Sequence, residues 1–163
     1  MLKHLIPTLF LAATATVASA QGGAVDRNDA AGRGGPAVQV SEFGRYTLRA
    51  NAVNSESLAP GTAENHGIER AADRAVLNLV VLERKDGRQM PVRAEVSATQ
   101  RNLLGQTEAI EMREIEQNGR VSYLGTFGLA PLRNFSFTIT ARPVGGGEPM
   151  TIEFEDRLIA RDR

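Results

Sequence analysis

The chain has 163 residues, no cysteine, two histidines and a formal net charge of +0 at pH 7. The absence of cysteine excludes thiol catalysis, iron–sulfur clusters and thiolate zinc sites. The balanced charge creates no field of one sign that would attract nucleic acid or an anionic membrane. The histidines are too few for a multi-histidine metal site, so we expect no bound metal and no cofactor.

Residues 1–20 have the pattern of a secretory signal peptide. Lys3 precedes an apolar run from Leu5 to Val17, and Ala18-Ser19-Ala20 is a small-x-small cleavage site, so cleavage before Gln21 is expected. The apolar run is short for a membrane span, which needs roughly 20 residues. No cysteine follows the cleavage site, which excludes a lipoprotein anchor. We expect a periplasmic or, alternatively, a secreted protein, with no stable membrane insertion once the signal is removed.

Residues 21–36 contain five glycines and no large aliphatic residue except Val25. Such a segment cannot bury enough apolar surface to offset the entropy lost on ordering, so we predict a disordered lead. Residues 37–163 are then expected to form a single domain. A domain of this size buries a substantial core, and without cysteine it is held together by packing.

The pattern of the next stretch predicts strand, helix, strand. Polar and apolar side chains alternate over residues 46–52, which indicates a half-buried strand. Pro60 suits the first position of a helix and Gly67 the position just past its end, so a short helix is predicted near residues 60–66. The continuous apolar run over residues 75–82 predicts a central strand that is covered on both faces.

Two dipeptides predict tight hairpins, Asp86-Gly87 and Asn118-Gly119. After the second hairpin, apolar residues alternate with polar ones in three further segments. These segments predict strands over residues 121–127, 135–141 and 150–154.

The stretch between the two hairpins has a less regular pattern. Alternation predicts a strand over residues 91–98 and a loop that begins at Gln100. A further strand is predicted over residues 110–116, where the alternation shifts by one residue, so a bulge is expected near Glu114. A helix over residues 103–116 is the competing prediction.

These elements amount to seven or eight short strands with turn signals between them and one short helix near residues 60–66. They predict an all-β fold, an antiparallel β-sandwich of immunoglobulin-like type rather than a parallel sheet. The chain has no tryptophan and no cysteine pair, which argues against an antibody-type domain. A small β-barrel is the architectural alternative.

A charged segment over residues 69–74, which we call the elbow, precedes the apolar strand predicted over residues 75–82. Six polar residues in or near it are candidates for a recognition loop held by rigid strands: Asn51, His66, Glu69, Arg70, Asp73 and Arg74. The alternative is a local ion-pair cluster that shapes the elbow and contributes little to stability when exposed. We identify no catalytic residues.

Several residue groups recur in the order found in an exported bacterial family: Phe43-Gly44, Asn51-Ala52, Gly67-Ile68, Leu77-Asn78, Tyr123-Leu124-Gly125-Thr126-Phe127 and Ile152-Glu153-Phe154. On these residues the folded part of the chain resembles the family grouped as domain of unknown function 4426. Four positions differ from the family pattern: Arg49-Ala50 replaces His-Tyr, His66 replaces an aromatic residue, and Ala71 replaces serine. These differences argue against catalysis there. The resemblance implies a location in the cell envelope and supplies no activity.

The export signal, the β-sandwich pattern and the lack of a catalytic constellation favour a non-enzymatic interaction or accessory module. Its expected partner is another envelope protein or a small ligand. A small hydrolase that uses carboxylates near Glu69 and Asp73 is one alternative. A structural envelope protein that pairs through an exposed sheet edge is another.

Overall fold

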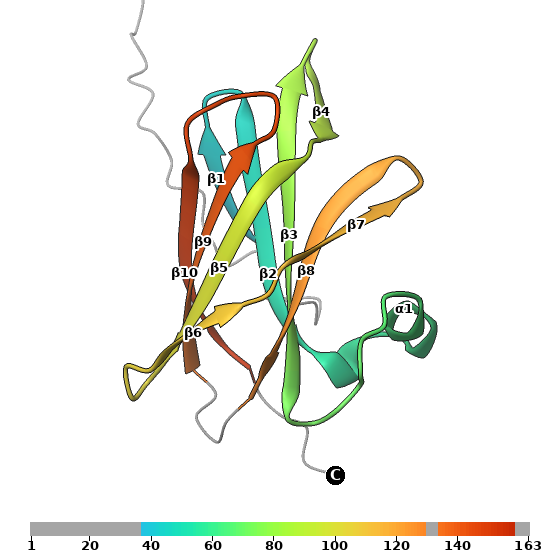
Figure 1. Cartoon of the computed structure of the whole chain (residues 1–163), viewed down its shortest axis with the longest axis vertical. Helices are drawn as coiled ribbons and strands as arrows, with labels where there is room; N and C mark the ends of the chain where they lie inside the picture. Colours follow the sequence, from blue (N-terminus) through green and yellow to red (C-terminus); the bar gives the residue numbers. More distant parts are fainter. Residues whose placement is uncertain (1–36, 130–133, 159–163) are drawn as a thin grey trace, which may run out of the picture.

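Two antiparallel sheets pack face to face in the computed structural model of the chain, which describes residues 37–129 and 134–158 (Figure 1). The six-stranded sheet has the order β1-β2-β3-β8-β7, with β4 paired to β3 beside this path: β1 (Gln39–Phe43), β2 (Tyr46–Asn54), β3 (Arg74–Lys85), β4 (Arg88–Pro91), β7 (Arg113–Gln117) and β8 (Arg120–Gly128). The four-stranded sheet has the order β10-β9-β5-β6: β5 (Ala94–Asn102), β6 (Thr107–Ile110), β9 (Asn134–Pro143) and β10 (Met150–Arg157). The predicted antiparallel sandwich is confirmed, with ten strands rather than seven or eight.

Two short helices connect β2 to β3: η1 (Ser55–Ser57) and α1 (Pro60–Asn65). The helix predicted near residues 60–66 is therefore confirmed, and Gly67 follows it with a φ of +61°, a conformation that glycine adopts without strain. Within the described residues, no helix is long and apolar enough to cross a membrane. The predicted signal peptide and disordered lead lie outside those residues.

The core between the sheets follows from the alternation of the sequence. Leu77 and Leu79 of β3 are 0% exposed and belong to one buried cluster with Phe135 and Phe137 of β9. Phe127 of β8 meets these two rings edge to face, with centroid separations of 5.6 and 5.4 Å. Edge-to-face contacts suit the charge distribution of aromatic rings. The core therefore joins the middle strand of one sheet to a central strand of the other.

Both predicted hairpins form, each with a two-residue turn. Asp86 and Gly87 have φ angles of 51° and 76° between β3 and β4, and Asn118 and Gly119 have 52° and 71° between β7 and β8. Positive φ at both central positions is the mark of the turn type that matches the twist of antiparallel strands. These two turns fix the register of the strands around the candidate site described below.

Two segments predicted as single strands are each divided, because the chain changes sheets within them. β4 ends at Pro91 in the six-stranded sheet, and β5 begins at Ala94 in the four-stranded sheet. In the same way β6 ends at Ile110 and β7 begins at Arg113 on the other sheet. The register change expected as a bulge near Glu114 is therefore a crossing between sheets. These two crossings account for the larger number of strands.

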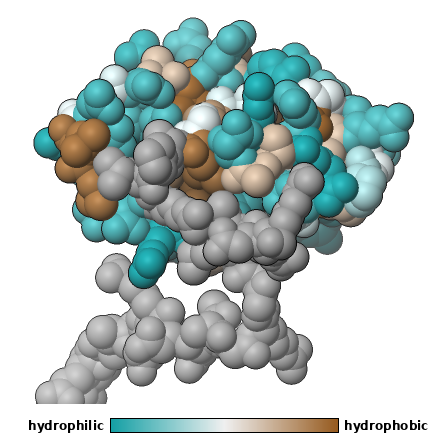
Figure 2. Space-filling model, turned by 90° about the horizontal axis from the view of Figure 1, so that it is seen from below, coloured by the Kyte–Doolittle hydropathy of each residue, from teal (hydrophilic) through white to brown (hydrophobic). Residues whose placement is uncertain are grey.

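The end of β5 also differs from the prediction. A loop was expected from Gln100, but this residue is buried within β5, and the turn begins only after Asn102. The Asn102 Oδ1 accepts hydrogen bonds from the N–H groups of Leu104 and Gln106, at 3.0 and 3.1 Å. This turn leads into β6, so the competing helix does not form. Leu103 and Leu104 are exposed at its tip. Figure 2 shows an apolar patch at the left edge of the molecule.

The apolar run over residues 75–82 lies in β3, which is flanked by β2 on one side and by β8 and β4 on the other. The prediction that both of its faces are covered is only partly correct. Of the side chains that point away from the core, Val76 and Leu82 are buried, whereas Asn78 and Val80 between them are half-exposed. The middle of the outer face of this sheet is therefore open.

Candidate functional site

The outer face of the six-stranded sheet is covered by a helix at the end where β3 begins. Helix α1 and the loop after it pack on this end and form a second, smaller apolar cluster beside the main core. Its buried members are Ala63, Ile68 and Val76, and the partly buried residues around them are Val53, Leu58 and Leu124. The short helix thus covers one end of the outer face, and Thr47 and Leu82 are buried beside β4 at the other end, which leaves the middle open.

A groove of about 1080 Å³ lies on this open middle, and we call it the outer groove. Asn78, Val80 and Leu82 of β3 form its floor, and His66 at the end of α1 closes one side. The other walls are β4, through Gln89–Pro91, and the β7–β8 hairpin. Concave sites of this kind, which mix apolar surface with a few polar groups, are typical ligand sites.

The outer groove exists because two strands share one side of β3. β8 pairs with β3 only between Arg74 and Leu79, whereas β4 pairs with it between Leu82 and Lys85. The first residues of β8, Arg120–Ser122, pair with β7 alone. β4 and the start of β8 consequently diverge, and the groove lies between them.

The charge of the outer groove has one sign. Arg49 of β2 and Arg120 of β8 line it, and no aspartate or glutamate is among the lining residues. Within the described part of the chain, neither arginine has an ion pair or a side-chain hydrogen bond. Two uncompensated guanidinium groups beside an apolar floor favour a ligand that carries a negative charge.

Two of the six candidate residues predicted from the sequence belong to this site. His66 lines the outer groove, and its carbonyl accepts a hydrogen bond from Arg113 Nη2 at 3.3 Å, which ties the end of α1 to β7. Asn51 lies beside the floor on β2, where its Oδ1 accepts a hydrogen bond from Asn78 Nδ2 at 3.1 Å. Asn51 therefore holds a residue of the floor in place.

The other four candidates lie in the elbow, outside the residues that line the outer groove, and all four are exposed: Glu69, Arg70, Asp73 and Arg74. Arg74 forms an ion pair with Glu69 at 3.3 Å, with side chains 49% and 66% exposed. An ion pair so exposed contributes at most about 1 kcal/mol. Arg70 donates a hydrogen bond to the Glu56 carbonyl at 2.8 Å. These contacts shape the elbow.

A buried serine holds the elbow in place through hydrogen bonds to its backbone. The sequence pattern did not indicate this role. Ser55 is 0% exposed, and its Oγ accepts a hydrogen bond from the Ala71 N–H at 2.9 Å and donates one to the Ala71 carbonyl at 3.0 Å. The hydroxyl thereby satisfies both backbone groups of one loop residue. In the sequence, Ser55 cannot be told apart from the exposed polar residues around it.

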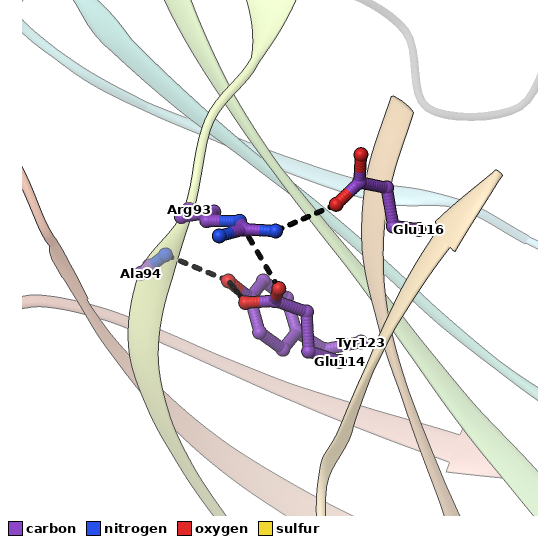
Figure 3. A network of polar contacts seen from close by, with 5 residues as sticks. All are labelled: Arg93, Ala94, Glu114, Glu116 and Tyr123. Atoms are coloured by element: carbon purple, nitrogen blue, oxygen red, sulfur yellow. Dashed lines mark hydrogen bonds and ion pairs between the residues drawn. The ribbon is translucent and has the colours of Figure 1, made fainter. Parts of the chain in front are cut away.

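A second polar network fastens the crossing from β4 to β5 (Figure 3). Arg93 contacts Glu114 Oε1 through Nε at 3.1 Å and Glu116 Oε2 through Nη2 at 2.6 Å. The Tyr123 hydroxyl accepts a hydrogen bond from the Ala94 N–H at 2.7 Å and donates one to Glu114 Oε2 at 3.2 Å. These contacts join β7 and β8 to the crossing, so the network stabilises the fold.

The network gives a pH-dependent prediction. Burial raises the pKa of Tyr123, although the hydrogen bond from the Ala94 N–H works in the opposite direction. The folded protein therefore keeps the phenol proton at a pH where the unfolded chain has lost it, and the free energy of unfolding should fall as pH rises above about 10. Urea unfolding across this range should show a weaker fall for Tyr123→Phe than for Tyr46→Phe. Equal falls in both variants would contradict this role of Tyr123.

Among the described residues, no group of three or more histidine, aspartate and glutamate side chains could hold a metal ion. The residues that line the outer groove offer charge, hydrogen bonds and apolar contact to a ligand.

The model of the domain of unknown function DUF4426 matches residues 40–160 and so covers most of the chain, including nearly all of the sandwich. The chain belongs to the DUF4426 family. A crystal structure of a DUF4426 family protein from Pseudomonas aeruginosa PAO1 has a TM-score of 0.66 and 27% sequence identity to it, over 77% of this chain and 97% of that chain. The family resemblance seen in the sequence is confirmed.

Two more distant solved structures share the fold of this DUF4426 protein. One is a copper-bound variant of FetP from uropathogenic Escherichia coli strain F11, with a TM-score of 0.56, 14% identity and coverage of 77% of this chain and 97% of that chain. The other is FetP as isolated, expressed recombinantly in the periplasm, with a TM-score of 0.57, 14% identity and coverage of 78% and 97%. No match was found among the curated proteins.

Sequence reasoning on this DUF4426 protein missed the two arginines of the outer groove. Arg49 occupies a position where the family tends to have histidine, and it was considered only as a difference from the family pattern. Arg120 directly follows the Asn118-Gly119 turn, so its place at the groove depends on how the hairpin diverges from β4. The polar face of the strand over residues 46–52 was the available signal for Arg49.

Proposed function

We propose that this DUF4426 protein is a non-enzymatic binding module whose ligand site is the outer groove. The observation that carries the proposal is the open middle of the six-stranded sheet, walled by α1, β4 and the β7–β8 hairpin. A sheet that only stabilised the fold would have no need of two unpaired arginines over an apolar floor. An interaction module in the envelope is the function class that fits this surface.

We also propose a periplasmic location. It is supported by the signal-peptide pattern of residues 1–20, and the structurally similar FetP was expressed in the periplasm. Fractionation of cells that carry the full chain should place the protein in the periplasmic fraction. Its retention in the cytoplasm would contradict the proposal.

Site-specific photo-crosslinking tests the site. A photoreactive amino acid at Gln117, exposed in the wall of the outer groove, should give a discrete adduct in intact cells. The same amino acid at Glu95, exposed on the four-stranded sheet, is the matched control. Excess purified, unlabelled protein should compete with the Gln117 adduct in envelope extracts. No adduct at Gln117, or equal adducts at both positions, would overturn the proposal.

Two other functions have less support. The copper of the FetP variant is not proposed for this chain, because the described residues contain no group of three ligating side chains. A hydrolase at the elbow would need two cooperating carboxylates, but Glu69 forms its ion pair with Arg74. An activity screen would compare the unchanged protein with a Glu69→Gln, Asp73→Asn double variant. The hydrolase hypothesis requires a hydrolytic activity that the unchanged protein has and the double variant has lost.

Pairing through a sheet edge remains a second candidate because β1 forms an outer edge of the six-stranded sheet and Val40 on it is 53% exposed. An unpaired edge with an exposed apolar side chain can take up a strand from another chain. Sedimentation of the purified protein should then show self-association that Val40→Lys abolishes. A monomer at all concentrations would exclude pairing between copies of this chain.

The strand order supports a further proposal, that the sandwich is immunoglobulin-like. The order β2-β3-β8-β7 facing β10-β9-β5-β6 corresponds in connectivity to A-B-E-D facing G-F-C-C′ in immunoglobulin domains. The outer groove would then lie on the face of the A-B-E-D sheet and not at the loops. An experimental structure in which β5 pairs within the six-stranded sheet would contradict this.

A further inference from the structure

We infer that the outer groove binds a small organic acid, in which an acidic group is joined to an apolar body, and that this ligand lies on the outer face of the six-stranded sheet. This inference rests on the proposed function, since it names the chemistry of the ligand for the same site. Three observations carry it: a row of side chains that places a free arginine beside apolar residues, walls that bound this row, and the lack of acidic residues among those that line the groove.

One row of side chains crosses the middle of the outer face from β2 to β7. Arg49 of β2 pairs with Val80 of β3, and Ile115 of β7 pairs with Ser122 of β8. The β3–β8 ladder, continued by one residue, brings Val80 level with Ser122. Side chains alternate between the two faces of a sheet, and the neighbours of Arg49 and Val80 along their strands are buried in the core, so the row faces outward. It offers in turn a cation, an apolar group, a hydroxyl and a second apolar group.

The apolar part of the row has the length of a medium-sized organic molecule. Neighbouring strands lie about 4.8 Å apart, so Val80 and Ile115, with β8 between their strands, are separated by about 10 Å. An extended alkyl chain of about eight carbons covers this length, because C–C bonds are about 1.5 Å long. His66 at the end of α1 and Gln89 of β4 bound the groove on the two sides of the row. A body of this size therefore fills the groove along the row.

The ligand lies over side chains and does not pair with a strand edge. The Val81 carbonyl accepts a hydrogen bond from the Val92 N–H at 2.9 Å, so the chain itself occupies the position beside β3 there. β4 also lies within 8 Å of β8, whereas an inserted strand needs about 4.8 Å on each side. Guanidinium, amide, hydroxyl and apolar side chains consequently make the contacts, and these suit a small molecule better than a peptide backbone.

The charge of the groove favours an acid. Among residues 37–129 and 134–158, Arg49 and Arg120 have no ion pair and no side-chain hydrogen bond, and none of the groove residues is acidic. A carboxylate beside Arg49 would accept charge-assisted hydrogen bonds while the apolar body lies over Val80. Arg120, farther along the hairpin, adds attraction through its positive charge. An ammonium group would meet uncompensated positive charge instead.

The first test titrates the mature protein with acetate, hexanoate, octanoate and octylamine and follows the amide resonances by NMR. Octanoate should bind with a dissociation constant of about 1 mM, as expected for a ligand of its size. Each added methylene should tighten binding about twofold, because a chain on an open face buries only part of its surface. Increasing salt should weaken the binding, and octylamine, which carries the same chain with the opposite charge, should not bind. The resonances of Val80 and Ser122 should shift.

An acidic head on an alkyl chain also occurs at the surface of a membrane. The walls formed by α1, β4 and the β7–β8 hairpin keep a flat surface away from the floor of the groove, so we expect a soluble acid. Sedimentation with phosphatidylglycerol vesicles distinguishes the two sources, because the protein should stay in solution. Vesicle binding without octanoate binding would make the lipid surface the ligand and overturn the soluble acid.

Arginine variants locate the acidic head. Arg49→Gln is expected to weaken octanoate binding about tenfold, as for the loss of a hydrogen bond between charged groups. Arg120→Gln should weaken it about two- to threefold, since a charge at a greater distance contributes less. Arg142→Gln removes an exposed arginine from the four-stranded sheet and should leave the affinity unchanged.

A valine variant locates the apolar body. Val80→Thr keeps a branched side chain that strands accept and replaces a methyl group with a hydroxyl. It should weaken octanoate binding about threefold and leave acetate binding unchanged. Val40→Thr makes the same exchange at a valine of β1 that is 53% exposed outside the groove, and it should change neither. Unfolding curves show whether each variant is folded, and the resonance shifts of the unchanged protein locate the ligand independently of any variant.

Each outcome supports or overturns the inference. Equal affinity for acetate and octanoate would mean a small-anion site and overturn the apolar body. Equal affinity for octanoate and octylamine would overturn the preference for an acid. Resonance shifts away from the outer face, or equal losses in Val80→Thr and Val40→Thr, would overturn the location. No binding of any probe, together with a Gln117 crosslink, would overturn this inference and leave the proposed function standing, whereas loss of the crosslink removes both.

Discussion

Leu79→Ala is expected to lower the free energy of unfolding by about 2–5 kcal/mol, the range for a buried leucine that leaves a cavity. Leu79 is 0% exposed in the middle strand of the six-stranded sheet and belongs to the main core cluster. The loss is a large share of the roughly 5–15 kcal/mol by which a domain is stable. The chain has no cysteine, so no disulfide compensates for it.

Chemical denaturation measures this loss, and Glu69→Ala is the control. The exposed ion pair of Glu69 with Arg74 should be worth less than about 1 kcal/mol. If Glu69→Ala proved as destabilising as Leu79→Ala, the elbow would be a buried polar network. The description of its charges as surface contacts would then be wrong.

Gly125→Ala is expected to lower the free energy of unfolding by about 1–3 kcal/mol or more, the range for overpacking a core. Here β8 passes closely under the crossing from β6 to β7. A Cβ at Gly125 would lie 2.5 Å from Ile110 Cγ2, 2.7 Å from Met112 Sδ and 3.0 Å from the Glu111 carbonyl oxygen. Met112 is flexible and can move, but the branched methyl of Ile110 and the Glu111 backbone cannot yield without displacing the crossing.

Gly128→Ala is the matched control for this prediction. Gly128 ends the same strand, is exposed, and a Cβ there would meet nothing within 4 Å. Its replacement should therefore change the free energy of unfolding much less. Thermal and urea unfolding of the two variants compare them directly. Equal stability of both would show that the crossing moves away from β8 at little cost.

Much of the fold was predictable because alternation and turn chemistry are local signals. The alternating segments over residues 46–52, 121–127 and 135–141 are strands, and both two-residue turns form at the predicted dipeptides. The crossings at Val92-Arg93 and Glu111-Met112 were not predictable. An extended chain keeps its alternation when it passes from one sheet to the other, so a single strand, a bulge and a sheet change look alike in the sequence.

The candidate site was less predictable, because it depends on where strands diverge. His66 and Asn51 were singled out as polar residues close to a short helix and on the polar face of a strand, and the structure places them at or beside the outer groove. Their role in recognition stays a prediction.

The elbow around Glu69 was singled out for its density of charge, yet Glu69 pairs with Arg74, and Arg70 bonds the Glu56 carbonyl. Arg120 gained its place through the pairing of β4 with β3. No pattern in the sequence around Arg120 predicts that β4 pairs with β3.

The two sheet crossings also bear on how quickly the chain reaches its native state. The β3–β4 and β7–β8 hairpins join neighbouring segments and can form early, within microseconds for a typical hairpin. The β3–β8 and β5–β9 ladders join segments far apart in the sequence, so long loops must close before their contacts stabilise anything. Because each crossing binds one sheet to the other, we expect the two sheets to form together, in one slow cooperative step on the scale of milliseconds to seconds.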